Sequence, residues 1–252
     1  MTRGSPKGAL HHEVWESLGG SDPDWAVLTD PARRHGGWTD HLDDFYASGR
    51  AEVSTIVGAF PPDAELHQAI DWGSGTGRLT FALLEHFDHV TAVDVSRSML
   101  ATLIDRAQQT GIEARVSAVL VGDLRPGSDH DLALSLLVLQ HLSCRAEAAD
   151  ALRSLVACVR VGGYIVVEIP DRPVNLKARL QPRFQLYRLL RTLGLPPARL
   201  HEHGLSGISM LCLTQTFVAA TLRGAGADLA AASTVRSDGA HRYVRYIARR
   251  SR

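Results

Sequence analysis

Apolar and polar positions alternate in blocks between residues 69 and 168, and each block matches a short strand or an amphipathic helix. The run Val90-Thr91-Ala92-Val93, for example, is apolar and β-branched, and a helical pattern opens a few residues after it. Alternating strands and helices of this kind predict a mostly parallel sheet with right-handed crossovers. Before this region, residues 42–57 repeat their apolar positions near the helical period and predict a helix that ends ahead of Pro61-Pro62.

The segments outside this alternation differ in composition. The N-terminal segment carries Trp15, Trp25 and Trp38 among glycine pairs and prolines, which indicates a turn-rich stretch. Residues 170–213 begin with basic residues set among leucines, which predicts an amphipathic basic helix or helix pair. Its cationic face is either solvated or contacts a membrane surface or an acidic substrate. The second half, residues 196–210, predicts loop and short extended chain.

Composition agrees with one α/β domain. A chain of 252 residues with 45% hydrophobic content can bury one large core, or one core and a small cap, without disulfides. Cys144, Cys158 and Cys212 are odd in number and widely spaced, which predicts neither a disulfide framework nor a zinc site and favours a cytoplasmic location. No signal-peptide pattern or bilayer-length apolar run is present, so no integral membrane segment is expected.

The formal net charge of zero, with 27 basic and 27 acidic residues, argues against nucleic acid as a partner and favours a small-molecule substrate. The sequence leaves the oligomeric state open between monomer and homodimer.

The most informative motif is the run from Asp71 to Gly77, where glycines at 73, 75 and 77 follow an apolar strand end. Glycines in this pattern allow a sharp turn and a close approach of the backbone to a ligand. A dinucleotide site usually spaces its glycines as GxGxxG and binds a pyrophosphate. Here the spacing is GxGxG and Asp71 adds a carboxylate, which suits a ligand with an ammonium group and no phosphate. The alternative is a plain surface turn.

A second acid, Asp94, ends the next predicted strand beside the glycine turn. One carboxylate can accept hydrogen bonds from both vicinal hydroxyls of a ribose, so this position favours a nucleoside ligand. The alternative is that Asp94 only caps the following helix, with Ser96 as the competing cap.

Together these residues resemble the signature of class I S-adenosylmethionine-dependent methyltransferases: Asp71-x-Gly73-x-Gly75-x-Gly77, then Val93-Asp94-Val95-Ser96, with Met99-Leu100 in the next helix. Residues 129–142 are similar to the fourth strand of that family and its exit loop, and residues 161–168 to its fifth strand. The resemblance implies a Rossmann-like α/β fold. It has a mostly parallel seven-stranded sheet flanked by helices, and a small cap from the N-terminus and the insertion after the fifth strand.

The resemblance also divides the chain. Residues 1–62 form an N-terminal helical lid, 63–169 the S-adenosylmethionine-binding core, and 170–213 the substrate cap. Residues 214–252 return to the core with a helix over 214–223, ended by Gly224 and Gly226, and with the last two strands near 229–235 and 243–248.

By the same resemblance, the cofactor is S-adenosylmethionine and the product S-adenosylhomocysteine. Its methionine part would lie against Asp71, Gly73, Gly75, Gly77 and the backbone of residues 135–137, which include Leu136. Asp94 would accept the ribose hydroxyls, and Val95 and Met99 would pack on the adenine. The adenine amino group would meet the segment of Asp123 and Leu124, unless the third strand ends nearer Ser117 and leaves Asp123 as an ordinary loop acid.

Two further candidates lie in the helix before the first strand, in a phrase that resembles part of one branch of the family. Tyr46 and Arg50 are four residues apart and share a helix face, from which a hydroxyl and a guanidinium could bind the carboxylate of the cofactor. The alternative places Tyr46 in a helix interface and Arg50 in solvent.

Methyl transfer depends mostly on holding the acceptor in line with the methyl group. A hydroxyl acceptor would still gain from a general base, and His141 is the first candidate because it follows the fourth strand; a purely structural histidine is the alternative. His201 and His203 in the cap are second candidates. No metal site is expected, because the histidine spacings lack the partners of a zinc site.

These inferences predict methyl transfer to a small-molecule acceptor, with oxygen favoured over nitrogen, in a biosynthetic or tailoring pathway for a secondary metabolite or sugar. The preference for oxygen rests on the histidines and on Ser135-Leu136-Leu137-Val138, which replaces the Asn/Asp-Pro-Pro-aromatic motif that amino-group enzymes of nucleic acid place there. The alternatives are N-methylation, a non-methyl reaction of the same cofactor and a non-catalytic cofactor-binding subunit. A dehydrogenase is the most distant rival.

Overall fold

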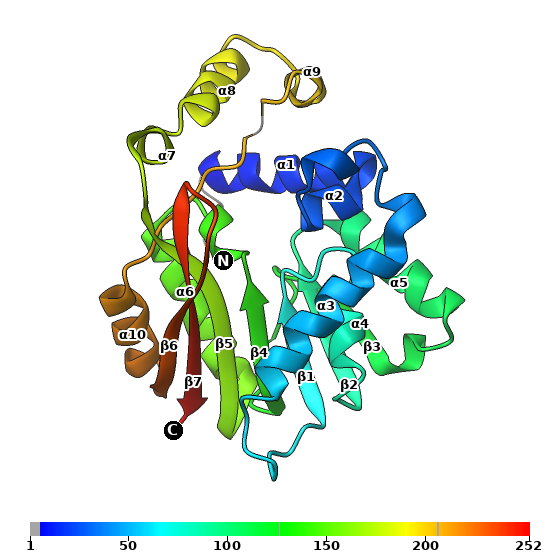
Figure 1. Ribbon diagram of the computed structural model, residues 1–252, viewed down its shortest axis with the longest axis vertical. Helices are drawn as coiled ribbons and strands as arrows, with labels where there is room; N and C mark the ends of the chain where they lie inside the picture. Colours follow the sequence, from blue (N-terminus) through cyan, green and yellow to red (C-terminus); the bar gives the residue numbers. More distant parts are fainter. Residues whose placement is uncertain (1–5, 126, 206) are drawn as a thin grey trace.

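The computed structural model describes residues 6–125, 127–205 and 207–252, with the side chains of all of these except 6–11, 198, 201 and 202. A seven-stranded sheet runs through the molecule in the order β3-β2-β1-β4-β5-β7-β6 (Figure 1). Its strands are β1 (Gln68–Trp72), β2 (His89–Asp94), β3 (Val116–Leu120), β4 (His130–Leu136), β5 (Val159–Pro173), β6 (Ala227–Ser237) and β7 (His241–Arg250). Only β7 runs antiparallel to its neighbours, β5 and β6. The predicted Rossmann-like fold is confirmed.

The strand order reverses at β1, which pairs in parallel with β2 on one side and with β4 on the other. Ile70 is the register partner of Thr91 in β2 and of Ala133 in β4. The carboxyl ends of these three strands therefore meet at one edge of the sheet, and such a switch point is where open α/β sheets bind ligands.

Helices cover both faces of the sheet. One apolar cluster joins α3 (Leu42–Val57), α4 (Arg78–Leu83) and α5 (Arg97–Gln109) to the strands, and a second joins α6 (Arg145–Cys158) and α10 (Gln215–Gly224) to the other face. The predicted helices over 42–57 and 214–223 are confirmed. The short 3-10 helices are η1 (Pro31–Arg33), η2 (Thr39–His41), η3 (Glu113–Arg115) and η4 (Leu139–His141).

The start of α5 settles which residue caps it. The Ser96 hydroxyl accepts a hydrogen bond from the Met99 N–H at 3.2 Å, so Ser96 is the N-cap. Asp94 lies two residues earlier, at the end of β2, and is therefore not the N-cap residue of α5.

The N-terminal segment corrects the turn-rich expectation. Residues of α1 (Pro6–Ser21) and α2 (Pro23–Val27) form helices, and α1 crosses above the ends of the strands (Figure 1). Gly19 lies within α1 because the helix packs closely on the start of α5, where a Cβ at Gly19 would meet the Ser96 Oγ at 2.8 Å. Tertiary packing therefore outweighs the low helix propensity of glycine here.

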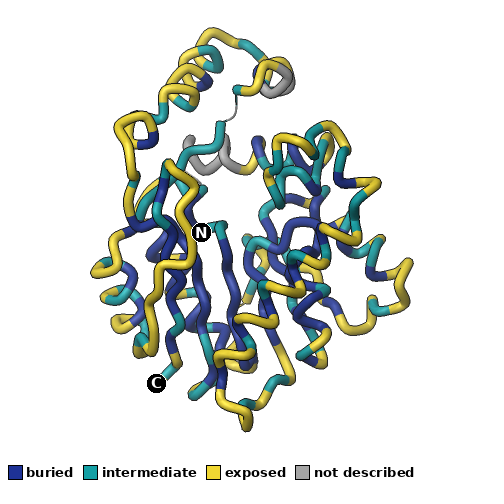
Figure 2. Tube along the Cα trace, in the orientation of Figure 1, coloured by how far each residue is buried: buried dark blue, intermediate teal, exposed yellow. Residues whose placement is uncertain are grey.

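The cap consists of α7 (Leu176–Leu180), α8 (Pro182–Thr192) and α9 (Pro197–Glu202), beyond α1 in Figure 1. The basic helix pair is confirmed, whereas α9 replaces part of the expected loop. Val14 and Leu18 of α1 join Tyr187 of α8 and Leu200 of α9 in a small apolar cluster that ties the cap to the N-terminal segment. Most of α7 and α8 is exposed, in contrast to the buried central strands β1 and β4 (Figure 2). Across the described residues, no helix combines the length and the apolar character needed to cross a membrane.

Candidate functional site

A cavity of about 1830 Å³ lies at the switch point, between the strand ends, the N-terminal helices and the cap. Of the sequence-predicted site residues it brings together Gly73, Gly75, Asp94, Val95, Met99, Leu124, Leu136 and His141. Its outer wall includes Trp15 of α1, Trp25 of α2 and Phe184 of α8. One space therefore joins the residues predicted for the cofactor to the segment predicted to select the acceptor.

Backbone N–H groups of the glycine turn donate hydrogen bonds to other groups of the protein. The Gly73 and Ser74 N–H groups donate to the Val93 carbonyl at 2.7 and 3.1 Å, and the Gly75 N–H donates to the Asp94 carboxylate at 2.9 Å. These three N–H groups are therefore already bonded, in contrast to a pyrophosphate site, where such groups face the ligand. The turn fits the expectation of a ligand without phosphate.

Backbone conformation and close packing explain the three glycines. Gly73, Gly75 and Gly77 have φ of +84°, +53° and +98°, which side-chain-bearing residues rarely adopt. A Cβ would also stand 2.2 Å from a methyl of Val138 at Gly73 and 2.3 Å from a methyl of Val27 at Gly75. The glycines thus let α2 and the loop after β4 close onto the turn. Gly77 does not line the cavity and instead begins α4.

Asp94 is buried and lines the cavity beside the turn. One carboxylate oxygen accepts from the Gly75 N–H and the other from the Ser96 N–H, both at 2.9 Å. Burial raises the pKa of the carboxyl, while these backbone donors lower it. Each oxygen keeps capacity for a further donor, as a ribose would supply.

An apolar wall adjoins Asp94. Its cavity-lining members, Val95, Met99, Val121 and Leu124, come from the segments that follow β2 and β3. Such a surface suits the flat face of a purine.

Asp71 lies below the cavity surface, at the end of β1. Its carboxylate is buried and accepts a hydrogen bond from the Thr80 hydroxyl at 2.7 Å. Burial raises its pKa to about 6. Because Asp71 is not among the cavity-lining residues, its predicted contact with a cofactor stays a prediction.

Two polar groups that sequence reasoning missed face the same cavity. Arg78 is buried, its Nη1 donates to the Ser48 hydroxyl at 3.2 Å, and its Nε has no hydrogen-bond partner among the described residues. Burial lowers the pKa of Arg78, whereas Glu52 and Asp71 raise it. The buried Ser74 hydroxyl likewise has no partner within the described part of the chain. The sequence clue was the arginine directly after the third glycine.

Besides Gly77 and Asp71, three more of the predicted cofactor residues do not line the cavity. Tyr46 packs against Phe45 and Phe81, and burial raises the pKa of its hydroxyl. Arg50 is exposed, with its Nε 4.0 Å from the Glu85 carboxylate. Both therefore take the alternative positions, in a helix interface and in solvent.

Asp123 is the third of these residues. It is exposed in the turn after β3, which ends at Leu120, and does not line the cavity. The strand ends between the two positions weighed from the sequence, and the predicted contact of Asp123 with the adenine stays a prediction. Leu124, the next residue, does reach the cavity.

His141 ends η4 and lines the cavity. Its Nδ1 is 3.4 Å from the Ser209 carbonyl and its Nε2 is 3.2 Å from the Gln140 amide nitrogen. The ring lies 5.1 Å from that of Trp15.

The loop between β4 and η4 has a strained backbone at Leu137, where φ is +62°. The Leu137 N–H donates a hydrogen bond to the Glu168 carbonyl, which helps to hold this conformation.

Of the two cap histidines, His203 does not join this group. His203 is exposed, its Nδ1 lies 2.8 Å from the Arg199 carbonyl, and it does not line the cavity. The side chain of His201 lies outside the described ones. Across the described residues, no three His, Cys, Asp or Glu side chains cluster as metal ligands.

The N-terminal helices are fixed over the cavity by two polar contacts. Asp24 of α2 is buried and accepts hydrogen bonds from Arg106 of α5 and from the Thr76 hydroxyl in the glycine turn. Glu16 of α1 accepts from the hydroxyls of Ser96 and Ser98 at the start of α5. These contacts join the lid to the same turn and helix that form the predicted cofactor site.

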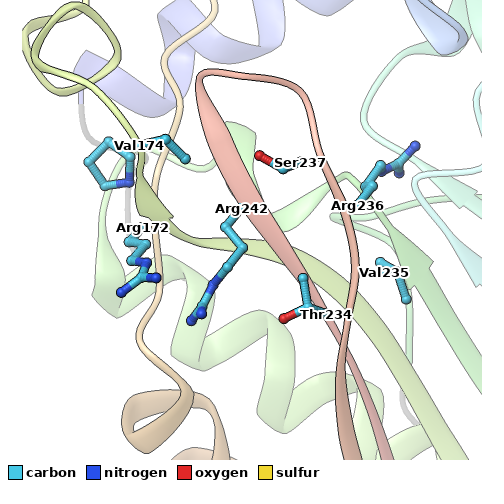
Figure 3. Close-up of a pocket in the computed structure, with 8 residues that line it drawn as sticks. Arg172, Val174, Thr234, Val235, Arg236, Ser237 and Arg242 are labelled. Atoms are coloured by element: carbon cyan, nitrogen blue, oxygen red, sulfur yellow. The ribbon is translucent and has the colours of Figure 1, made fainter.

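A smaller hollow of about 650 Å³ lies between the end of β5 and the β6–β7 hairpin (Figure 3). Two of the three arginines that line it have carboxylate partners: Arg242 is paired with Asp171, and Arg236 with Glu168. Arg236 also lines the large cavity. The large cavity is therefore the stronger candidate site.

Residues 69–163 match a family model described as a methyltransferase domain. No curated protein sequence matches the chain. Among solved structures, the chain is similar to a magnesium protoporphyrin IX methyltransferase from Synechocystis PCC 6803 with bound S-adenosylhomocysteine. That pair has 17% identity and a TM-score of 0.64, over 96% of this chain and 99% of the other.

It is also similar to a 1,6-didemethyltoxoflavin-N1-methyltransferase from Burkholderia thailandensis, with 19% identity and a TM-score of 0.61 over 100% of this chain and 93% of the other. An N-methyltransferase from Bradyrhizobium japonicum shows 14% identity and a TM-score of 0.58 over 96% of this chain and 100% of the other. At these identities the likeness shows the shared fold, and the acceptor has to be argued from the cavity itself.

Proposed function

We propose that this chain, whose residues 69–163 match a methyltransferase-domain model, is a class I S-adenosylmethionine-dependent methyltransferase that transfers a methyl group to an oxygen of a small-molecule acceptor held beneath the cap. One observation carries the proposal. The cavity that holds Gly73, Gly75 and Asp94 continues without a break to His141 and to the cap helices. Cofactor and acceptor can therefore meet inside one cavity.

The residues at the strand ends fit S-adenosylmethionine, which supplies an activated methyl group when bound. Asp94 would accept the ribose hydroxyls, and the apolar wall of Val95, Met99 and Leu124 would take the adenine. The buried Arg78 Nε and Ser74 hydroxyl would supply donors to the methionine carboxylate. A buried arginine that lacks one partner is a natural site for a carboxylate.

The part of the cavity that would bind the acceptor is expected to act mainly by orienting it. The walls formed by α1, α2 and the cap would hold the acceptor in line with the methyl group, which is the principal demand of this reaction. His141 would take the proton of an acceptor hydroxyl at Nε2, with the Ser209 carbonyl holding the proton on Nδ1. For that step the acceptor hydroxyl replaces the Gln140 amide as the neighbour of Nε2.

Parts of the cavity lining support an acceptor that is aromatic and carries an acidic group. Trp15, Trp25 and Phe184 offer flat apolar surfaces, and Lys177 and Arg183 bring cationic side chains to the same cavity. Two of the structural neighbours are methyltransferases of magnesium protoporphyrin IX and of 1,6-didemethyltoxoflavin, which are both conjugated ring systems. We place the reaction in the tailoring of such a biosynthetic product.

The test is incubation with methyl-labelled S-adenosylmethionine and a panel of hydroxylated and aminated aromatic acids, followed by mass spectrometry of the products. Label in an ether or ester product supports the proposal. Label on nitrogen would contradict the proposed oxygen acceptor and indicate N-methylation. Release of methylthioadenosine without labelled product would contradict methyl transfer and point to use of the aminocarboxypropyl arm.

A further inference from the structure

The cap concentrates positive charge. Residues 172–201 contain no Asp or Glu and seven Lys or Arg: Arg172, Lys177, Arg179, Arg183, Arg188, Arg191 and Arg199. Because the whole chain has a formal net charge of zero, the rest of it carries the balancing negative excess. Lys177, Arg179, Arg183 and Arg188 are exposed on α7 and α8. The cap is thus a cationic surface on a neutral protein.

The same two helices also expose apolar side chains. Among the described residues, six of the eight large hydrophobic side chains that are exposed lie between 174 and 193: Val174, Leu176, Leu180, Leu186, Leu189 and Leu193. Leu176 and Leu180 are four residues apart in α7. Leu186 and Leu189 are three residues apart in α8, and Leu193, its C-cap residue, follows at the next four-residue step. We call these five leucines the leucine stripe. Leu189 and Leu193 are 57% and 68% exposed.

The buried side of α8 is occupied already. Tyr187 is fully buried and packs in the cluster that contains Val14 and Leu200, and Phe184 lines the cavity. The leucine stripe therefore lies apart from the face that holds the cap to the lid, and Figure 2 colours most of α7 and α8 as exposed. An amphipathic helix with its second apolar face exposed needs a partner for that face.

The combination of leucines and cations without acids fits the interface of an anionic bilayer. Leucine side chains enter the boundary between headgroups and acyl chains, and flanking Lys and Arg attract anionic lipids. A second copy of the chain fits poorly, because a two-fold interface sets the same patch against itself and would oppose the two sets of cations. Nucleic acid would leave the leucines unburied.

We infer that α7 and α8 form a docking surface for anionic membranes, with the leucine stripe inserted and the exposed cations at the headgroups. The same helices line the cavity through Ala178, Gln181 and Phe184. Docking would therefore hold the acceptor cavity next to the bilayer, where an amphiphilic aromatic acid partitions. This surface does not depend on the accepting atom proposed above.

The test is flotation of the intact chain with vesicles of phosphatidylcholine alone and with vesicles that also contain phosphatidylglycerol. We expect binding to the anionic vesicles, weakened by added salt, and little binding to the neutral ones. Leu186→Gln with Leu189→Gln should weaken anionic binding about 10-fold or more through lost apolar insertion. Arg179→Glu with Arg188→Glu should do so by a similar factor. None of these four residues lines the cavity.

Matched controls separate this surface from general effects. Val161→Gln removes an equally exposed apolar side chain on β5, and Arg223→Glu reverses a charge on α10, and both should bind vesicles like the unaltered chain. Circular dichroism checks that the variants stay folded. No binding to anionic vesicles, equal binding to both kinds, or equal losses in the controls would overturn the inference. So would a dimer in sedimentation velocity that the leucine variants convert to monomer.

Discussion

The Asp24 carboxylate accepts two hydrogen bonds from the Arg106 guanidinium, both at 2.7 Å, and so ties the N-terminal α2 to α5. A third donor, the Thr76 hydroxyl, reaches the same carboxylate at 2.8 Å from within the glycine turn. Val27, three residues after Asp24, lies against Gly75. One buried ion pair thus holds the lid on the turn predicted to bind the cofactor.

Arg106→Met should therefore loosen the lid. The change leaves the Asp24 carboxylate buried with only the Thr76 hydroxyl, and removing one partner of a buried pair costs about 3 kcal/mol or more. We expect faster amide hydrogen exchange over residues 22–28 and weaker binding of S-adenosylhomocysteine in calorimetry. The exposed pair Arg153–Asp150 supplies a control, because Arg153→Met should change stability by only about 0.5 kcal/mol or less. Unchanged exchange in the Arg106 variant would refute the role of this pair.

Arg78 and Arg50 make a matched comparison for the carboxylate of the cofactor. Arg78→Met should weaken S-adenosylhomocysteine binding by about 1.5–3 kcal/mol, as expected for loss of a hydrogen bond to a charged group. It should barely change the binding of decarboxylated S-adenosylmethionine, which lacks the carboxylate. Arg50→Met should leave both affinities unchanged, because Arg50 is exposed. Equal losses for the two ligands in the Arg78 variant would show that Arg78 acts only through the fold.

His141→Ala should lower kcat far more than it weakens cofactor binding, by about 100-fold for loss of a general base. The pH profile of kcat should lose its acidic limb in the same variant, a change that a purely structural histidine would not cause. His203→Ala is the control, because His203 is exposed and does not line the cavity. Equal turnover in the His141 variant would return this residue to a structural role.

Asp71 should make stability depend on pH. Its pKa rises from 3.8 to about 6 on folding, so the folded state holds the proton more tightly than the unfolded chain. The stability that this proton contributes is complete below the unfolded pKa and is lost as pH rises through the folded one. Relative to Asp71→Asn, the wild-type free energy of unfolding should fall by about 3 kcal/mol between pH of about 4 and 6. Denaturant titrations across this range would show it, and a pH-independent difference would contradict the burial of an ionisable Asp71.

The sequence predicted the parts of the fold that local patterns specify. Apolar blocks located the strands, and the acid at 94 and serine at 96 marked the end of β2 and the cap of α5. The helix α1 was missed, because Gly19-Gly20 is typical of a turn when read alone. Only the close packing of Gly19 on Ser96, across more than seventy positions of sequence, explains why a glycine belongs in that helix.

The site was predictable where strand ends determine it and less so elsewhere. Asp94, Val95 and Met99 line the cavity as expected, since parallel strands end at one edge. Helical spacing placed Tyr46 and Arg50 on one face but could not say which face meets the cavity. The Arg78 position depends on where α4 begins after the turn, and the depth of Asp71 depends on the whole sheet; neither follows from local pattern.

The most direct test of the account is calorimetric titration of the chain with S-adenosylhomocysteine, in the wild type and in Asp94→Ala. We predict saturable binding to the wild type and a loss of about 1–3 kcal/mol in the variant, through the missing ribose hydrogen bonds. Asp123→Ala should bind like the wild type, because Asp123 is exposed away from the cavity. Failure of the wild type to bind S-adenosylhomocysteine, with binding of NAD instead, would contradict the proposed cofactor site and revive the dehydrogenase alternative.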